Sequence, residues 1–123
     1  MKRHPLLIPL SQAHHHSLAL CLRILRDPAA DHRADIAAHQ NDLLAHFAAE
    51  EAQFAPLWAA LGQPELQTRF TEDHARLRAM LATPAWDDAE WKRQFAETLR
   101  EHARFEERVL FPALTPLLPE RLI

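Results

Sequence analysis

The chain contains very few of the residues that build turn-rich sheets or disulfide frameworks. Its 123 residues include one glycine, one cysteine and no tyrosine. A single cysteine, Cys21, excludes an internal disulfide and favours a reducing compartment. Alanine, leucine, glutamate and arginine are abundant instead, and these residues favour helices over strands. The composition therefore predicts an all-α protein.

Two further absences exclude classes of partner. The formal net charge is −3, so the chain lacks the basic excess that nucleic-acid-binding proteins use. The apolar stretch in "MKRHPLLIPLSQ" is interrupted by Pro9 and ends at Ser11, which is too short for a signal peptide or a membrane span. We expect a cytoplasmic protein that binds neither nucleic acid nor membrane.

Prolines separate four amphipathic segments with short connections. The predicted helices run from about Pro9–Ser11 to Arg26, from Pro28 to near Trp58, from about Pro64 to Thr83, and from about Asp87 to Phe111. Short connections place consecutive helices antiparallel to one another. The sequence thus predicts an antiparallel up-down-up-down four-helix bundle that forms a single domain over residues 1–123.

The pattern H-x-x-x-E-E occurs twice in the chain. It reads "HFAAEEAQFAP" from His46 and "HARFEERVLFP" from His102. On a helix, His46 and Glu50 lie about one turn apart on one face, and so do His102 and Glu106. One such pair is close to what chance gives, but two copies that share the second glutamate, an apolar residue and a proline are not. Both pairs border the apolar stripes of their helices, so we expect them to face the core. The predicted inward stripes are Leu18, Cys21, Leu22 and Leu25 in the first helix, Ile36, Leu43, Phe47 and Phe54 in the second, and Phe95, Leu99, Val109 and Leu110 in the fourth.

The first and third predicted helices each add a histidine to this core. His74 borders the apolar stripe of the third helix, and the run His14-His15-His16 lies in the first. The apolar residues after His15 have the same spacing as those after His74, which selects His15. A helical wheel places His14 nearer the centre of the stripe, so His14 stays an alternative.

Buried carboxylates need a cation, because burying them unpaired costs several kcal/mol each. The apolar stripes carry no lysine or arginine that would neutralise them. Four imidazoles and two carboxylates around two metal ions meet this need, and such donors suit iron, manganese or zinc. The predicted metal ligands are His15, His46, Glu50, His74, His102 and Glu106.

Several neighbouring residues receive supporting roles. Glu51 and Glu107 lean away from the stripes, so we expect them to be solvated or to contact a ligand rather than the metal. His39 lies on the same face as His46 and could contact a ligand or line an access path. Cys21 is expected to be a small core residue.

This arrangement resembles the hemerythrin-like (HHE cation-binding) domains over nearly the whole chain. The resemblance rests on one histidine in the first and third helices and H-x-x-x-E-E in the second and fourth, with "LFP" after the last copy. It implies a bundle that holds two bridged iron ions, with Glu50 and Glu106 bridging the ions or completing the site. The oxygen-carrying hemerythrins have a second histidine one turn along the third helix, where this chain has Arg78. This departure favours a more open four-His, two-Glu centre over simple oxygen carriage.

The resemblance implies a non-haem di-iron protein that binds or senses O2 or NO, or senses iron, with peroxide as a further partner. No general base or nucleophile stands outside the metal set, so we expect at most weak peroxidase- or ferroxidase-like activity. There are two alternatives. One is a buffer or storage module for iron, manganese or zinc without O2 chemistry. The other is an interaction bundle with a structural metal.

Overall fold

The computed structural model describes residues 2–119, and all regular structure in this range is helical. The four long helices are α1 (Ile8–Arg26), α2 (Arg33–Phe54), α4 (Pro64–Ala82) and α5 (Ala89–Phe105). The shorter segments are a 3-10 turn (Ala55–Leu57), α3 (Trp58–Leu61), a π-helical turn (Glu106–Leu110), α6 (Phe111–Leu114) and a second 3-10 turn (Thr115–Leu117). The prediction of an all-α fold is confirmed.

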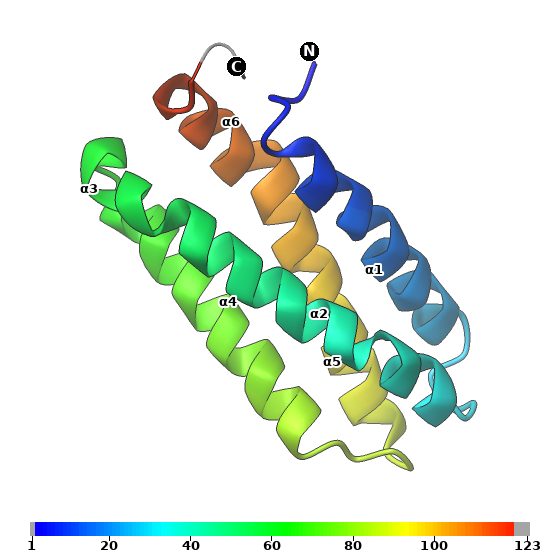
Figure 1. Cartoon of the computed structure of the whole chain (residues 1–123). Helices are drawn as coiled ribbons and strands as arrows, with labels where there is room; N and C mark the ends of the chain where they lie inside the picture. Colours follow the sequence, from blue (N-terminus) through cyan, green and yellow to red (C-terminus); the bar gives the residue numbers. More distant parts are fainter. Residues whose placement is uncertain (1, 120–123) are drawn as a thin grey trace.

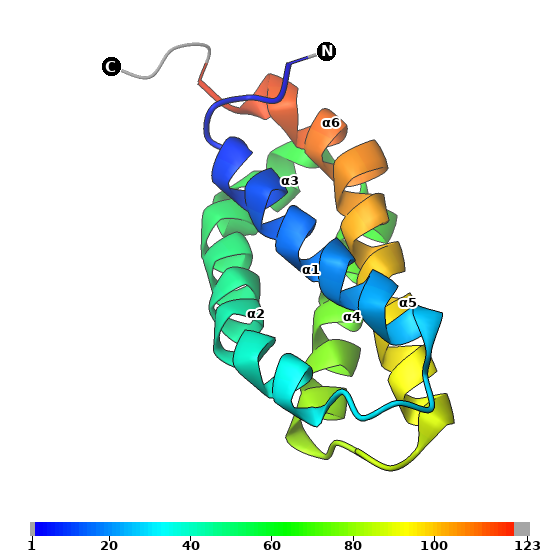
Figure 2. The ribbon, with the colours of Figure 1, turned by 90° about the vertical axis from the view of Figure 1, so that its right-hand side faces the viewer.

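The long helices form a four-helix bundle. In Figure 1, successive long helices run in opposite directions along the bundle, and Figure 2 shows the same arrangement from the side. Helix α1 packs against α2 and α5, and α4 packs against the same two helices. The four helices therefore enclose one core. None of the helices in residues 2–119 is long and apolar enough to cross a lipid bilayer.

Proline, glycine and one aspartate define most helix boundaries. Pro64 opens α4, and Gly62, with a left-handed φ of 65°, ends α3. Asp88 caps α5 by accepting hydrogen bonds from two backbone N–H groups of its first turn. The second helix begins at Arg33, later than predicted, because residues 27–30 form a turn instead. Lys92 donates a hydrogen bond of 2.6 Å to a carbonyl of that turn.

The apolar core has two parts with a polar layer between them. One cluster contains Leu20, Cys21, Ile24, Ile36, Leu43, Phe47, Leu77, Leu81, Phe95, Ala96 and Leu99. The other contains Leu7, Leu10, Phe54, Phe70, Phe105, Leu110, Phe111 and Leu114. On each long helix, buried histidine or glutamate stands between residues of the two clusters. The fold therefore supports a polar layer on apolar packing at both ends.

Three side chains differ from the predicted stripes. Leu22 and Val109 were expected to face inward, but they are 54% and 45% exposed. Lys92 lies on the buried face of α5, although no cation was expected there. Its ammonium group is bound to the carbonyl of Ala30, so it does not neutralise the carboxylates of the polar layer.

Candidate metal centre

The polar layer brings together four histidines and two glutamates from the four long helices and the π-helical turn. Its members are His14, His46, Glu50, His74, His102 and Glu106. The two carboxylates are fully buried, and every imidazole except that of His46 is buried. Five of the six predicted ligands are therefore in this cluster.

The predicted choice of His15 is wrong, because its side chain lies on the exposed face of α1. His14 occupies the cluster instead, on the face that also carries Leu10, Ser17 and Cys21. The spacing argument failed because a serine, Ser17, takes the place that a leucine takes after His74. The spacing argument therefore placed the apolar stripe of α1 one residue too far along the chain. The helical wheel gave the right alternative.

The six side chains form two groups that share both carboxylates. His14 and His46 form one group with Glu50 and Glu106, and His74 and His102 form the other with the same two glutamates. Within each group, one donor atom from each residue lies within 4.8 Å of all the others. Two sites with common carboxylates are the arrangement of a carboxylate-bridged two-metal centre.

The distances between the imidazole nitrogens and the two carboxylates show the same sharing. Glu106 Oε1 lies 3.0 Å from Nε2 of His14 and 3.2 Å from Nε2 of His102. The oxygens of Glu50 each lie 3.3 Å from an imidazole Nε2, that of His46 for one and that of His74 for the other. Each glutamate therefore faces one imidazole from each group.

The imidazoles in the second group also point at a common position. The Nε2 atoms of His74 and His102 are 3.1 Å apart. Two nitrogen ligands about 2.1 Å from one ion lie about 3 Å apart when they bind at right angles. The separation of these two nitrogens therefore suits ligands of a single ion.

Several buried polar atoms have no hydrogen-bond partner among the described residues. They are Nε2 of His46, both carboxylate oxygens of Glu50 and Oε2 of Glu106. The 3.3 Å approaches to Glu50 lack hydrogen-bonding geometry. Unsatisfied buried carboxylates are strongly destabilising, and metal ions would satisfy all four atoms. The residues present therefore fit a pair of bound cations.

The two carboxyl groups also perturb one another. Burial raises the pKa of Glu50, and the neighbouring Glu106 raises that pKa further. Burial acts in the same direction on Glu106, but its close contacts with Glu50, His102 and His14 lower the pKa of Glu106 below its ordinary value. A cation between the two carboxylates removes the repulsion that separates their pKa values.

Three of the imidazoles have a carboxylate next to Nδ1, the ring nitrogen that does not face the centre. Nδ1 of His14 lies 2.6 Å from Glu107, and Nδ1 of His74 lies 2.7 Å from Glu51. Nδ1 of His102 lies 2.9 Å from Asp73. A carboxylate at Nδ1 keeps the proton there, which leaves Nε2 free to bind a metal.

Glu51 and Glu107 were predicted to be solvated or to contact a ligand, and the structure shows the second arrangement. Both contact a candidate ligand and stand outside the two donor groups. Asp73 was not predicted, because its role depends on the packing of α4 against α5 and no local pattern marks it. Burial raises the pKa of Asp73, but His102 and Arg69 lower it more, so this carboxylate is ionised at neutral pH.

Arg78 has a definite place in this arrangement. Its guanidinium group donates two hydrogen bonds, of 2.5 and 2.8 Å, to the carboxylate of Glu51. The arginine lowers the pKa of Glu51, and the contact with His74 lowers it further. Arg78 therefore orients the carboxylate that holds His74.

The end of the second histidine-glutamate motif forms a π-helical turn. The N–H group of Phe111 bonds to the carbonyl of Glu106, five residues earlier. Pro112 follows and has no N–H for an α-helical bond. The wider turn keeps Glu106, Leu110 and Phe111 all buried. The sequence predicted that the fourth helix ends at about Phe111, but it did not predict the π-helical turn.

A helical bundle with a buried layer of four imidazoles and two shared carboxylates defines a class of metal-binding proteins. The family model of the hemerythrin HHE cation binding domain matches residues 9–114, and the chain belongs to this family. Membership implies that the protein binds cations. No curated protein and no solved structure matches the chain significantly.

Proposed function

We propose that the protein holds two iron ions in this layer and uses them to bind or sense a small diatomic ligand, O2 or NO. The observation that carries the proposal is the pair of donor groups that share both buried carboxylates. Such a division supplies two adjacent ions with equivalent sets of nitrogen and oxygen donors. A structural site for one ion needs no such sharing.

The residues divide the work between the two ions. His14 and His46 would hold one ion, and His74 and His102 the other, with Glu50 and Glu106 between them. Each ion thus receives four protein donors, which leaves coordination positions for an external ligand. Iron with open positions supplies the capacity to bind O2 or NO and to exchange electrons.

The donor set supports iron, manganese or zinc over metals that prefer sulfur. Cys21 lies in an apolar cluster, and burial raises the pKa of its thiol to about 12. The centre therefore contains only imidazole and carboxylate donors. Among these metals, the resemblance to hemerythrins favours iron.

Metal analysis and absorption spectra of the purified protein test the proposal. We expect two irons per chain in the wild type, and near-ultraviolet absorption that changes when O2 or NO is added to the reduced protein. The variants His46→Ala and His102→Ala should each hold less iron. His15→Ala is the matched control, because it removes an imidazole beside the site, and it should hold two irons.

Other results would favour other functions. Two zinc ions and no response to O2 or NO would overturn the proposal. Rapid loss of metal to a mild chelator with the helices retained would indicate a metal buffer or storage module. Unfolding on chelation would indicate a structural metal.

A further inference from the structure

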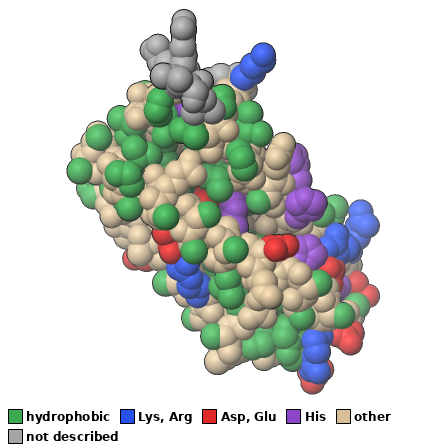
Figure 3. All heavy atoms as spheres, in the orientation of Figure 1, with side chains coloured by type: hydrophobic (Ala, Val, Ile, Leu, Met, Phe, Trp, Pro, Cys, Tyr) green, Lys and Arg blue, Asp and Glu red, His purple; other side chains and the backbone are tan. Residues whose placement is uncertain are grey.

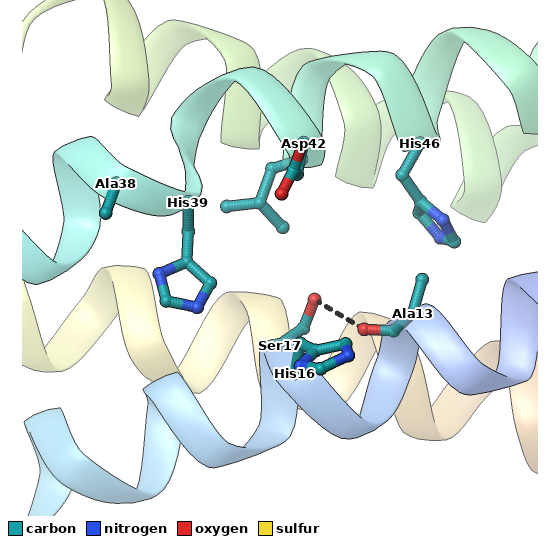
Figure 4. A pocket seen from close by; sticks show the side chains of 8 residues that line it. Ala13, His16, Ser17, Ala38, His39, Asp42 and His46 are labelled. Carbon is teal, nitrogen blue, oxygen red and sulfur yellow. Dashed lines mark hydrogen bonds between the residues drawn. The ribbon is translucent and has the colours of Figure 1, made fainter.

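A groove between α1 and α2 leads from the protein surface to the candidate metal centre. It encloses about 290 Å³, and its wall includes His16, His39 and Asp42 as well as His46. Figure 4 shows the side chains of His39 and Asp42 on α2 and that of His16 on α1, with His46 further along α2. Figure 3 shows histidine side chains gathered on this face of the molecule.

The side chains of His16, His39 and Asp42 are of the types that bind divalent cations, and they make few interactions with the rest of the protein. Nδ1 of His39 lies 2.8 Å from a backbone carbonyl of its own helix, which leaves Nε2 of that ring open. His16 and Asp42 are exposed and make no hydrogen bond or ion pair with any residue in the described range. Two imidazoles and one carboxylate are thus available to replace water molecules around an incoming cation.

At its inner end the groove reaches His46, which is the most exposed of the candidate ligands. The side chain of His46 is 10% exposed, whereas those of the other three candidate histidines are 5% exposed or less. Its Nε2 has no hydrogen-bond partner in residues 2–119. Of the candidate ligands, His46 is the one that lines the groove.

Aromatic side chains cover the other candidate histidines. The ring of His74 lies between Phe47 and Phe70, at centroid distances of 4.6 and 4.1 Å. The ring of His14 stacks on Phe111 at 5.6 Å. Four other surface hollows of the molecule are lined by none of the candidate ligands.

We propose that this groove is the route by which divalent metal ions reach the centre, with His16, His39 and Asp42 as transient ligands along it. The proposal rests on the proposed metal centre and adds how that centre is loaded. An uncharged diatomic molecule has no need of such side chains. A hydrated cation does, because it must exchange water for protein ligands before it enters an apolar bundle.

The test measures how fast the metal-free protein takes up Co²⁺, whose visible absorption changes on binding, in a stopped-flow instrument. We expect His16→Ala/Asp42→Asn to load roughly tenfold more slowly than the wild type, because local attraction and capture of the ion are lost. The matched control is His15→Ala/Glu72→Gln, which removes one exposed histidine and one exposed carboxylate outside the groove. It should load at the wild-type rate.

A second pair of variants tests the groove by bulk, without changing charge. Ala38 lines the groove and is exposed, so Ala38→Trp should fill its mouth and slow loading. Ala45→Trp places the same bulk on an exposed position of α2 outside the groove and should not. All four variants should bind two ions at equilibrium, because none changes a candidate ligand.

The outcomes separate the two proposals. Wild-type rates in both groove variants would overturn the route while leaving the metal centre intact. Equal slowing in the groove variants and their controls would also overturn it. A wild-type protein that binds no metal ion would overturn the proposed centre itself.

Discussion

The two halves of the candidate centre differ in how firmly the protein holds them. In the half formed by α4 and α5, both His74 and His102 have a carboxylate at Nδ1 and aromatic rings around them. In the half formed by α1 and α2, His14 has such a carboxylate, but His46 has no hydrogen-bonded carboxylate at Nδ1 among the described residues. The first half is closed, and the second opens onto the groove.

The difference indicates that the two halves have different roles, although their donor atoms are equivalent. A closed half holds its imidazoles in one orientation whether or not an ion is present, because a carboxylate fixes each ring at Nδ1 and aromatic side chains pack around it. An open half lets an ion in, since one of its ligands is free to adjust. The four predictions below test this comparison, and they are ordered by the size of the expected effect.

The largest effect should come from the carboxylates that both halves share. Glu50→Gln or Glu106→Gln should reduce the bound metal from two ions per chain to nearly none, because each carboxylate belongs to both donor groups. Metal analysis after gel filtration measures this loss. His15→Ala should retain both ions.

Glu50→Gln has a second expected result that excludes misfolding as the cause. Burial and Glu106 raise the pKa of Glu50, so this ionisable group makes the metal-free fold less stable at neutral pH than an uncharged group would. The metal-free variant should therefore unfold at a higher temperature than the metal-free wild type. A lower unfolding temperature would contradict our account of the layer.

Single histidine variants should distinguish the two halves. His46→Ala and His74→Ala should each lose about one of the two ions. Only His74→Ala should strongly destabilise the metal-free protein, on the order of 2 kcal/mol, because it empties space between Phe47 and Phe70. Chemical denaturation of the metal-free variants measures this. Equal destabilisation by both variants would show that the halves are equally closed.

The sequence predicted the bundle and most of the centre, because both depend on helical periodicity. Glu50 and Glu106 follow from that periodicity, since each lies one turn after a histidine on a buried face. His14 could also be placed by the helical wheel, and only the comparison of His15 with His74 pointed elsewhere.

The remaining features depend on packing between helices. Asp73 contacts a histidine of another helix, and the groove exists only where α1 and α2 meet. The π-helical turn after Phe105 needs both a proline and a buried glutamate that must stay on the inner face. No pattern within a single helix specifies such contacts.

A smaller effect is expected from the carboxylates behind the imidazoles. Asp73→Asn should weaken metal binding by about 10- to 100-fold, because His102 loses the partner that fixes its orientation. Competition with a chelator of known affinity measures the change. Asp42→Asn is the matched control. It removes a carboxylate from the groove that makes no hydrogen bond or ion pair with a candidate ligand in the described structure, and it should leave the equilibrium affinity unchanged. An equal loss of metal affinity in both variants would contradict the distinction between residues that hold the metal ions and residues that only load them.

The smallest effect concerns the metal-free protein and pH. Burial lowers the pKa of His102, but Asp73 and Glu106 raise it more, to about 9, whereas an unfolded histidine has a pKa of about 6.5. The folded state therefore binds this proton more tightly. The resulting contribution to stability is full below about pH 6.5 and is lost as the pH rises to about 9.

The unfolding temperature of the metal-free wild type should thus fall by a few degrees between pH 6.5 and pH 9. Asp73→Asn should flatten this decline, because Asp73 is the first of the partners that raise the pKa of His102. His46→Ala should retain the decline, since His46 is not among the groups that hold this proton. A decline that disappears in His46→Ala and persists in Asp73→Asn would place the proton in the open half and reverse the comparison.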